Sequence, residues 1–276
     1  MRLARGGGDF MDWINWHPEA WAFLFAIQGM YLLAVEPLRK EFSWADRFDR
    51  RKAAYFTLGL LIIGLAEGTP LHDLSERYLF SAHMTQHLLL MLLAPPLLLM
   101  GTPEWLLRPL TTQRWMQPVM RVLTKPVLAG ILFNTVLIAW HVPMFYDGAL
   151  RIHGLHYVQH LVFLFASVLL WWPVLSPLPE HPRLSYGGQL FYLFVVAFPQ
   201  KLLAAMLTLT GRTLYPTYAG AERVFGISAH MDQQIGGSIM WVPMALILFG
   251  AFAVVFFVWF SKAEREEEEM RRGRMG

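Results

Sequence analysis

The sequence predicts an all-α membrane protein, a bundle of seven transmembrane helices, on the strength of three observations. Of the 276 residues, 55% are hydrophobic and only 16% are charged, whereas a soluble domain carries about 25% charged residues. Several apolar runs approach the ~20 residues that a helix needs to cross a bilayer. These runs are continuously apolar and do not alternate, so the sequence argues against the strands of a membrane β-barrel.

The seven predicted spans occupy most of the chain. Trp21 and Tyr31 mark the two ends of the first span, as expected for aromatic side chains at the headgroup level. The third span carries Pro95 and Pro96, which we expect to break its helix. Lys201 lies within the sixth span, where it can reach toward the headgroups or pair with a carboxylate. In order, the spans cover approximately residues 20–35, 53–66, 81–103, 126–141, 156–175, 189–210 and 235–260.

Residues 1–260 are therefore predicted to form a single transmembrane domain, and residues 261–276 a charged, solvated helical tail. Residues 1–10 are glycine-rich and polar, so we do not expect a cleavable signal peptide. The sequence has no repeat of fixed period and no second soluble domain.

The basic residues indicate how the bundle is oriented. One set of alternate flanks of the spans holds 16 Lys and Arg residues, and the other set holds 6. Because cytoplasmic loops are enriched in Lys and Arg, the N-terminus is predicted outside and the C-terminal tail in the cytoplasm. The same rule accounts for the pI near 9.2, so we expect the chain to contact the lipid bilayer and no nucleic acid.

This orientation places nine of the ten histidines on the outer side of the membrane. His83 and His87 lie four residues apart in the third span, so they stand one above the other on a helix, roughly 6 Å apart along its axis. Two imidazoles at this spacing can chelate one metal ion. His156 and His160 repeat the spacing where the fifth span begins. Ionisable residues inside a span are costly and indicate a function by default.

Further candidate metal ligands are predicted on the same side of the membrane. They are His141, His230, Met84, Asp73 and Asp232. Imidazole suits copper and zinc, and thioether adds a preference for Cu(I). Thiolate ligands are excluded because the chain has no cysteine. The sequence thus predicts a copper site in the outer leaflet.

Each candidate also has a structural interpretation. A single histidine near a helix end is most often an interfacial or hydrogen-bonded residue. Most of the 15 methionines are expected to serve packing. Asp232 could instead cap the last span.

Two segments resemble a known family. Residues 81–103, SAHMTQHLLLMLLAPPLLLMGTP, and residues 230–243, HMDQQIGGSIMWVP, are similar to the CtaG family of cytochrome c oxidase assembly factors, which are multi-span proteins of bacterial plasma membranes. The resemblance extends over predicted spans two to seven. The positions that match the motifs are His83, Met84, His87, Pro95, Pro96, Asp232, Gln233, Gln234, Gly236, Gly237 and Trp241.

The resemblance implies a non-catalytic role in maturing a haem–copper oxidase, by handling copper for its metal centres. The implied partners are the oxidase subunits and a periplasmic or extracellular copper donor. Two alternatives stay open: a haem-binding membrane electron-transfer protein, with haem held between His83 or His87 and His156 or His160, and a copper transporter. A zinc-dependent membrane hydrolase is less favoured, because the sequence has no HExxH motif.

Overall fold

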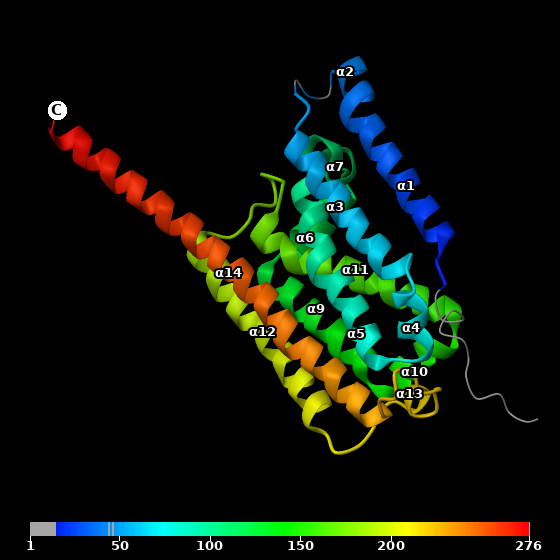
Figure 1. Ribbon diagram of the computed structural model, residues 1–276. Helices are drawn as coiled ribbons and strands as arrows, with labels where there is room; N and C mark the ends of the chain where they lie inside the picture. The colour runs from blue at the N-terminus through cyan, green and yellow to red at the C-terminus, as the bar shows by residue number, and fades with distance from the viewer. Residues whose placement is uncertain (1–14, 44, 46, 276) are drawn as a thin grey trace, which may run out of the picture.

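The computed structural model (Figure 1) describes residues 15–43, 45 and 47–275, and in this part of the chain the secondary structure is helical, without strands. Residues 1–10, which we did not expect to form a signal peptide, lie outside the described residues. In chain order the elements are α1 (Pro18–Leu33), the π-helical η2 (Ala34–Leu38), α2 (Arg39–Glu41), α3 (Arg50–Glu67), α4 (Leu71–Arg77), α5 (Phe80–Leu88), the π-helical η3 (Leu89–Leu93), α6 (Ala94–Gly101), α7 (Glu104–Thr111), α8 (Met116–Leu123), α9 (Pro126–His141), α10 (Pro143–Arg151), α11 (His153–Leu175), α12 (Tyr186–Leu209), α13 (Pro216–Ala219) and α14 (Ala229–Met275).

Among the described residues, five helices are long and apolar enough to cross a membrane, and the count rises to seven if each of two bent pairs is one span. The bent pairs are α3 with α4, at 48°, and α8 with α9, at 79°. The five single helices are Pro18–Glu41, Phe80–Gly101, Gly154–Leu175, Tyr186–Leu209 and Ala229–Arg274. The all-helical fold with several candidate spans is confirmed, while the count of seven and the orientation stay predictions.

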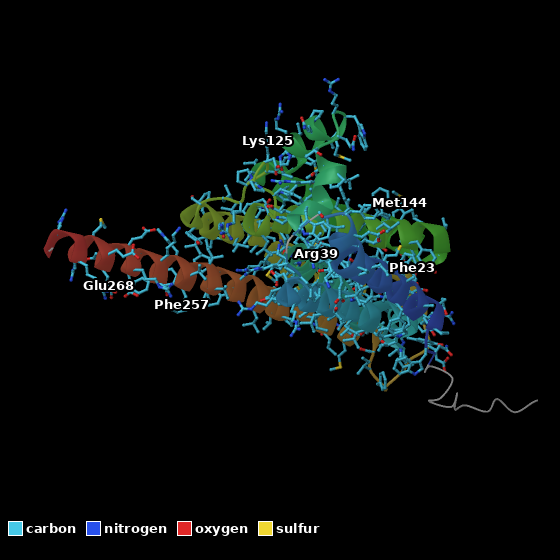
Figure 2. The ribbon with its side chains drawn as sticks, turned by 90° about the horizontal axis from the view of Figure 1, so that it is seen from above. Phe23, Arg39, Lys125, Met144, Phe257 and Glu268 are labelled. Carbon is cyan, nitrogen blue, oxygen red and sulfur yellow. The ribbon has the colours of Figure 1, made fainter. Side chains whose placement is uncertain are left out.

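The outer surface of the bundle is apolar. Phe23 on α1, Met144 on α10 and Phe257 on α14, which are labelled in Figure 2, are each more than 60% exposed. Large apolar side chains exposed on several helices are costly in water but favourable against lipid tails. This surface agrees with a bundle that lies in a bilayer.

The predicted break at Pro95 and Pro96 is wrong. Helix continues through both prolines, from Phe80 to Gly101, and is π-helical over Leu89–Leu93, directly before them. Proline has no N–H, so two backbone hydrogen bonds to the preceding turn are lost, and its ring crowds the carbonyl of that turn. A π-helical turn widens the helix where this crowding occurs, so the chain changes its hydrogen-bond pattern without ending the helix.

The basic stretch between the third and fourth predicted spans forms the short helices α7 and α8. Both combine exposed apolar side chains with a basic one: α7 carries Leu110 and Arg108, and α8 carries Val119 and Arg121. Helices with this division of apolar and basic side chains favour the membrane interface. At eight residues each, they are too short to give the apolar run by which the spans were recognised.

Two adjacent glycines let α14 pack closely against its neighbours. A Cβ atom added at Gly236 would collide with the Phe80 ring on α5, and one at Gly237 would lie 2.8 Å from the Thr208 backbone nitrogen on α12. Figure 1 shows α12 and α14 running side by side along one flank of the bundle. The Gly-Gly pair therefore has a packing role, joining α14 to two helices at once.

The charged tail is helical, as predicted. Helix α14 continues without interruption to Met275 and projects beyond the bundle, where Figure 2 labels Glu268. All described side chains from residue 261 to residue 274 are exposed.

Candidate metal centre

The inner pair of the site, His83 and His87, lies on one face of α5. Their ring centroids are 4.1 Å apart, as the spacing of four residues predicts. His83 is 0% and His87 5% exposed. Neither ring nitrogen of either residue has a hydrogen-bond partner among the described residues. A buried polar atom without a partner costs about 1–3 kcal/mol, so four such atoms on adjacent side chains call for a ligand.

The outer pair, His156 and His160, lies on α11 with ring centroids 4.2 Å apart. Each ring is oriented by a carboxylate: His156 Nδ1 lies 2.7 Å from Glu76 Oε1, and His160 Nδ1 lies 2.9 Å from Glu67 Oε1. Within the described part of the chain, Nε2 of both rings is buried and has no partner. Metal-binding histidines show this arrangement, in which a carboxylate holds one nitrogen and the other faces the ion.

His141, at the end of α9, is oriented in a similar way by the backbone. Its Nδ1 lies 2.7 Å from the Leu137 carbonyl oxygen, to which it can donate. Its Nε2 is buried without a partner among the described side chains and backbone groups. The tautomer with hydrogen on Nδ1 leaves the Nε2 lone pair available to a metal ion.

These five histidines come together from three helices. The ring centroids of His83 and His156 are 5.9 Å apart, those of His87 and His160 are 5.9 Å apart, and those of His87 and His141 are 6.3 Å apart. We call His83, His87, His141, His156 and His160 the histidine cluster. The sequence predicted all five as ligands, and the structure brings them together.

His72 on α4 connects the two carboxylates that orient the outer pair. Its Nδ1 lies 3.1 Å from Glu67 Oε2 and its Nε2 lies 3.1 Å from Glu76 Oε1. Both nitrogens can donate only when the ring is an imidazolium, whose charge then lies between the two carboxylates. Glu76 was not among the predicted site residues, although it stands four positions after His72 and so on the same face of α4.

A group of aromatic side chains covers the cluster from the side of α10 and α13. The Tyr146 ring lies 5.0 Å from that of His83, and the Tyr215 ring lies 4.2 Å from that of Tyr146. The Tyr218 hydroxyl donates to the Ser75 carbonyl, which ties α13 to α4. Burial raises the pKa of Tyr215 and that of Tyr218 above the usual value, so both hydroxyls stay protonated donors. These tyrosines were also missed, because nothing in their local sequence marks them.

The structure gives Asp232 and His230 other contacts. Asp232 is fully buried and accepts hydrogen bonds from the backbone N–H groups of Phe80 (2.6 Å) and Ser81 (3.1 Å) and from the Ser81 hydroxyl. It therefore caps the start of α5 and not, as the sequence alternative had it, the start of its own helix. His230 Nε2 lies 2.9 Å from the Thr210 carbonyl oxygen. Through these contacts, both residues join helix ends.

Of the remaining residues that the sequence singled out, one lies at the histidine cluster and two lie outside it. Met84 is 1% exposed and lies beside His87 and His141. Asp73 is at the periphery, with Oδ2 at 3.8 Å from His17 Nε2 and Oδ1 at 3.6 Å from Arg77. Lys201 is exposed on α12, not buried in the bundle.

The glutamines of the DQQ segment serve structure. Gln233 accepts a hydrogen bond from the Leu214 N–H (2.7 Å) and donates to the Arg212 carbonyl (3.1 Å). Gln234 donates to the Thr208 carbonyl (3.3 Å). Together they fasten the start of α14 to the end of α12 and the loop after it.

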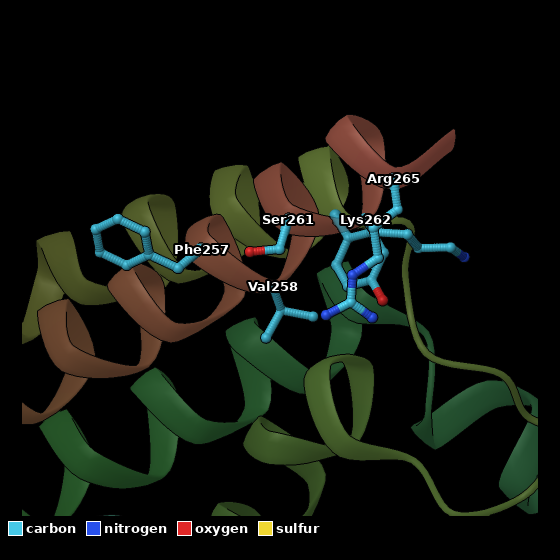
Figure 3. Close-up of a pocket in the computed structure, with 6 residues that line it drawn as sticks. Phe257, Val258, Ser261, Lys262 and Arg265 are labelled. Carbon is cyan, nitrogen blue, oxygen red and sulfur yellow. The ribbon is translucent and has the colours of Figure 1, made fainter. Parts of the chain in front are cut away.

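As the side chains stand, no group of three or more His, Asp or Glu residues within the described chain is already arranged around one metal position. A bound ion would draw the imidazoles of the cluster inward, to the ~2 Å distance at which nitrogen ligands lie. A larger groove of about 610 Å³ lies elsewhere, between Tyr186 and the tail of α14 (Figure 3). Its lining includes Lys262 and Arg265, whose positive charge is unsuited to a cation.

Fold and site together define a helical membrane protein with a buried, carboxylate-supported histidine cluster. The chain belongs to the family of cytochrome c oxidase caa3 assembly factors, Caa3_CtaG, whose model matches residues 29–262. It is 28% identical to an uncharacterized protein of Mycobacterium leprae over 63% of this chain and 30% of that protein. A second uncharacterized protein, from Mycobacterium bovis, is 28% identical over 62% of this chain and 29% of its own length. The chain thus spans less than a third of the length of these relatives, and no solved structure matches it significantly.

Proposed function

We propose that this assembly factor binds copper at the histidine cluster and passes it to a haem–copper cytochrome c oxidase, without catalytic turnover of its own. One observation carries the proposal. Seven buried ring nitrogens of the cluster lack a partner among the described residues: both of His83, both of His87, and Nε2 of His141, His156 and His160. Imidazole is a preferred ligand of copper, and the family's role in assembling a cytochrome c oxidase points to that oxidase as the acceptor.

The donor set suits a cargo that has to be released. The chain has no cysteine, so copper would be held by imidazole and thioether without the strong thiolate bond. The carboxylates Glu67 and Glu76 lie behind the outer histidines and would offset the charge of the ion. We further propose that the cluster faces the outer side of the bacterial plasma membrane, that the chain contacts the oxidase subunits there, and that a copper donor outside the membrane loads it.

The alternatives are less well supported. A haem group needs a pocket of several hundred Å³, whereas the rings of His83 and His87 lie close to those of His156 and His160, with centroids 5.9 Å apart in both cases. A copper transporter would need metal-binding groups along the whole bundle. Among the described residues of α6 and α9, the buried ones are apolar or glycine except for Asn134 and the cluster's His141.

A strain that lacks this protein is expected to keep its oxidase polypeptides but to lose most oxidase activity when copper is limiting, because the metal centres stay unfilled. The measurement is oxidase activity in membranes, with the subunits quantified by immunoblotting. Complementation with the wild-type chain should restore activity, and the His83→Ala/His87→Ala chain should not. Undiminished activity in the deletion strain under copper limitation would refute the assembly role.

A further inference from the structure

Four methionines gather next to the histidine cluster. A small cavity lies between α5, η3, α9 and α14, and its lining is Met84, His87, Leu88, Met91, Leu137, His141, Met240 and Met244. Half of the lining residues are therefore methionines, contributed by two separate segments of the chain. The cavity measures about 10 Å³, room for a single water-sized sphere.

The nitrogens of this cavity are free to bind. His87 has two buried ring nitrogens without a partner among the described residues, and His141 has one. Because His141 Nδ1 lies against the Leu137 carbonyl, its Nε2 is the nitrogen left for a ligand. Imidazole nitrogens without a partner in the described part of the chain, together with four thioethers, thus border one cavity.

This cavity differs from the outer pair, His156 and His160, in the charged groups nearby. The carboxylates of Glu76 and Glu67 lie behind His156 and His160. The residues that line the cavity include no Asp, Glu, Lys or Arg, so they carry no charge when the two imidazoles are neutral. A divalent ion in a buried space without an anionic ligand is strongly disfavoured. A monovalent ion costs less, and thioether is a soft ligand that favours Cu(I).

These four methionines differ from others in the chain because they are buried beside the histidines. Met84, Met91, Met240 and Met244 are each at most 6% exposed. By contrast, Met231, which directly follows His230, is 53% exposed, and Met206 on α12 is 51% exposed.

We infer that this methionine-lined cavity is a Cu(I) site, distinct in chemistry from the carboxylate-supported outer pair, and that His87 belongs to both. The inference rests on the proposed function and specifies the valence in which the protein holds its copper. Copper would arrive as Cu(I) among His156, His160 and the two carboxylates and settle, without a change of valence, against His87, His141 and the thioethers.

The test is the double variant Met240→Leu/Met244→Leu, because leucine replaces methionine in a core at a cost below about 1.5 kcal/mol. The purified proteins are titrated anaerobically with Cu(I) against bicinchoninate, and separately with Ag(I) and with Zn(II). We expect the affinity for Cu(I) and Ag(I) to fall at least about tenfold, or about 1.4 kcal/mol, and the affinity for Zn(II) to stay as in the wild type. The matched control Met206→Leu/Met231→Leu should bind all three ions as the wild type does.

The outcomes separate the two proposals. Wild-type protein that binds Cu(I), with equal affinity in the Met240→Leu/Met244→Leu variant, would overturn the methionine site and leave the copper role standing. Equal losses for Cu(I) and Zn(II) would also overturn it, because the site would then show no preference for a soft ion. Wild-type protein that binds neither Cu(I) nor Cu(II) would overturn both. Thermal unfolding of each variant ensures that only folded protein is compared. Met91→Leu, on η3 instead of α14, supplies an independent test and should also weaken Cu(I) binding.

Discussion

Replacing His83 and His87 together by alanine is expected to remove most of the copper that co-purifies with the protein. The two rings carry four of the seven unpartnered ring nitrogens of the cluster and stand in ring contact with His156, His160 and His141. Without them, three of the seven ring nitrogens that lack a partner among the described residues remain. The measurement is copper per polypeptide by elemental analysis of the wild type and of the variant.

Two controls make this result specific. His181→Ala removes a histidine from the loop between α11 and α12, outside the cluster, and should leave the copper content unchanged. His83→Leu/His87→Leu fills the volume that alanine leaves empty and should lose copper to the same extent as the alanine variant. Equal copper in the wild type and in both double variants would show that the ion is bound elsewhere.

Replacing Asp232 by alanine is expected to destabilise the protein by on the order of 3 kcal/mol, because it leaves three donors at the buried start of α5 without an acceptor. The conservative change Asp232→Asn keeps one acceptor oxygen, so the stability of that variant should fall between those of the wild type and of Asp232→Ala. The measurement is thermal unfolding in detergent. Glu264→Ala, which changes an exposed carboxylate on the tail of α14, should have no effect.

The same pair of variants separates the capping role from the metal-binding role that the sequence suggested for Asp232. A cap predicts that folded Asp232→Asn protein retains its copper. Loss of copper at unchanged thermal stability would contradict the cap and support a ligand.

The features that the sequence predicted well are those that depend on neighbours along the chain. Apolar runs of sufficient length predicted the candidate spans, because a bilayer demands them locally. The pairs at His83/His87 and His156/His160 followed from the periodicity of one helix. Their convergence followed from topology, since histidines at one end of a bundle have to lie near one another.

The features that the sequence did not predict depend on residues far apart in the chain. Asp232 caps a helix that begins 152 positions earlier, and such a contact leaves no local pattern. Glu76 is placed behind His156 only by the bend between α3 and α4. Met240 and Met244 looked like ordinary core residues until the fold set them beside His87.

The course of the helix through Pro95 and Pro96 was missed for a different reason. A π-helical turn directly before the prolines compensates for the lost hydrogen bonds and the crowding. Propensity along the chain predicts a break at such a pair and does not reveal the compensating turn.

The central claim is that copper is bound by the imidazoles of the histidine cluster, and X-ray absorption at the copper edge tests it most directly. Protein loaded with one equivalent of copper should show nitrogen ligands at about 2.0 Å together with the outer-shell scattering of several imidazole rings. This signature should disappear in His83→Ala/His87→Ala. Copper that shows no imidazole scattering in the wild type, or the same spectrum in the double variant, would contradict the account.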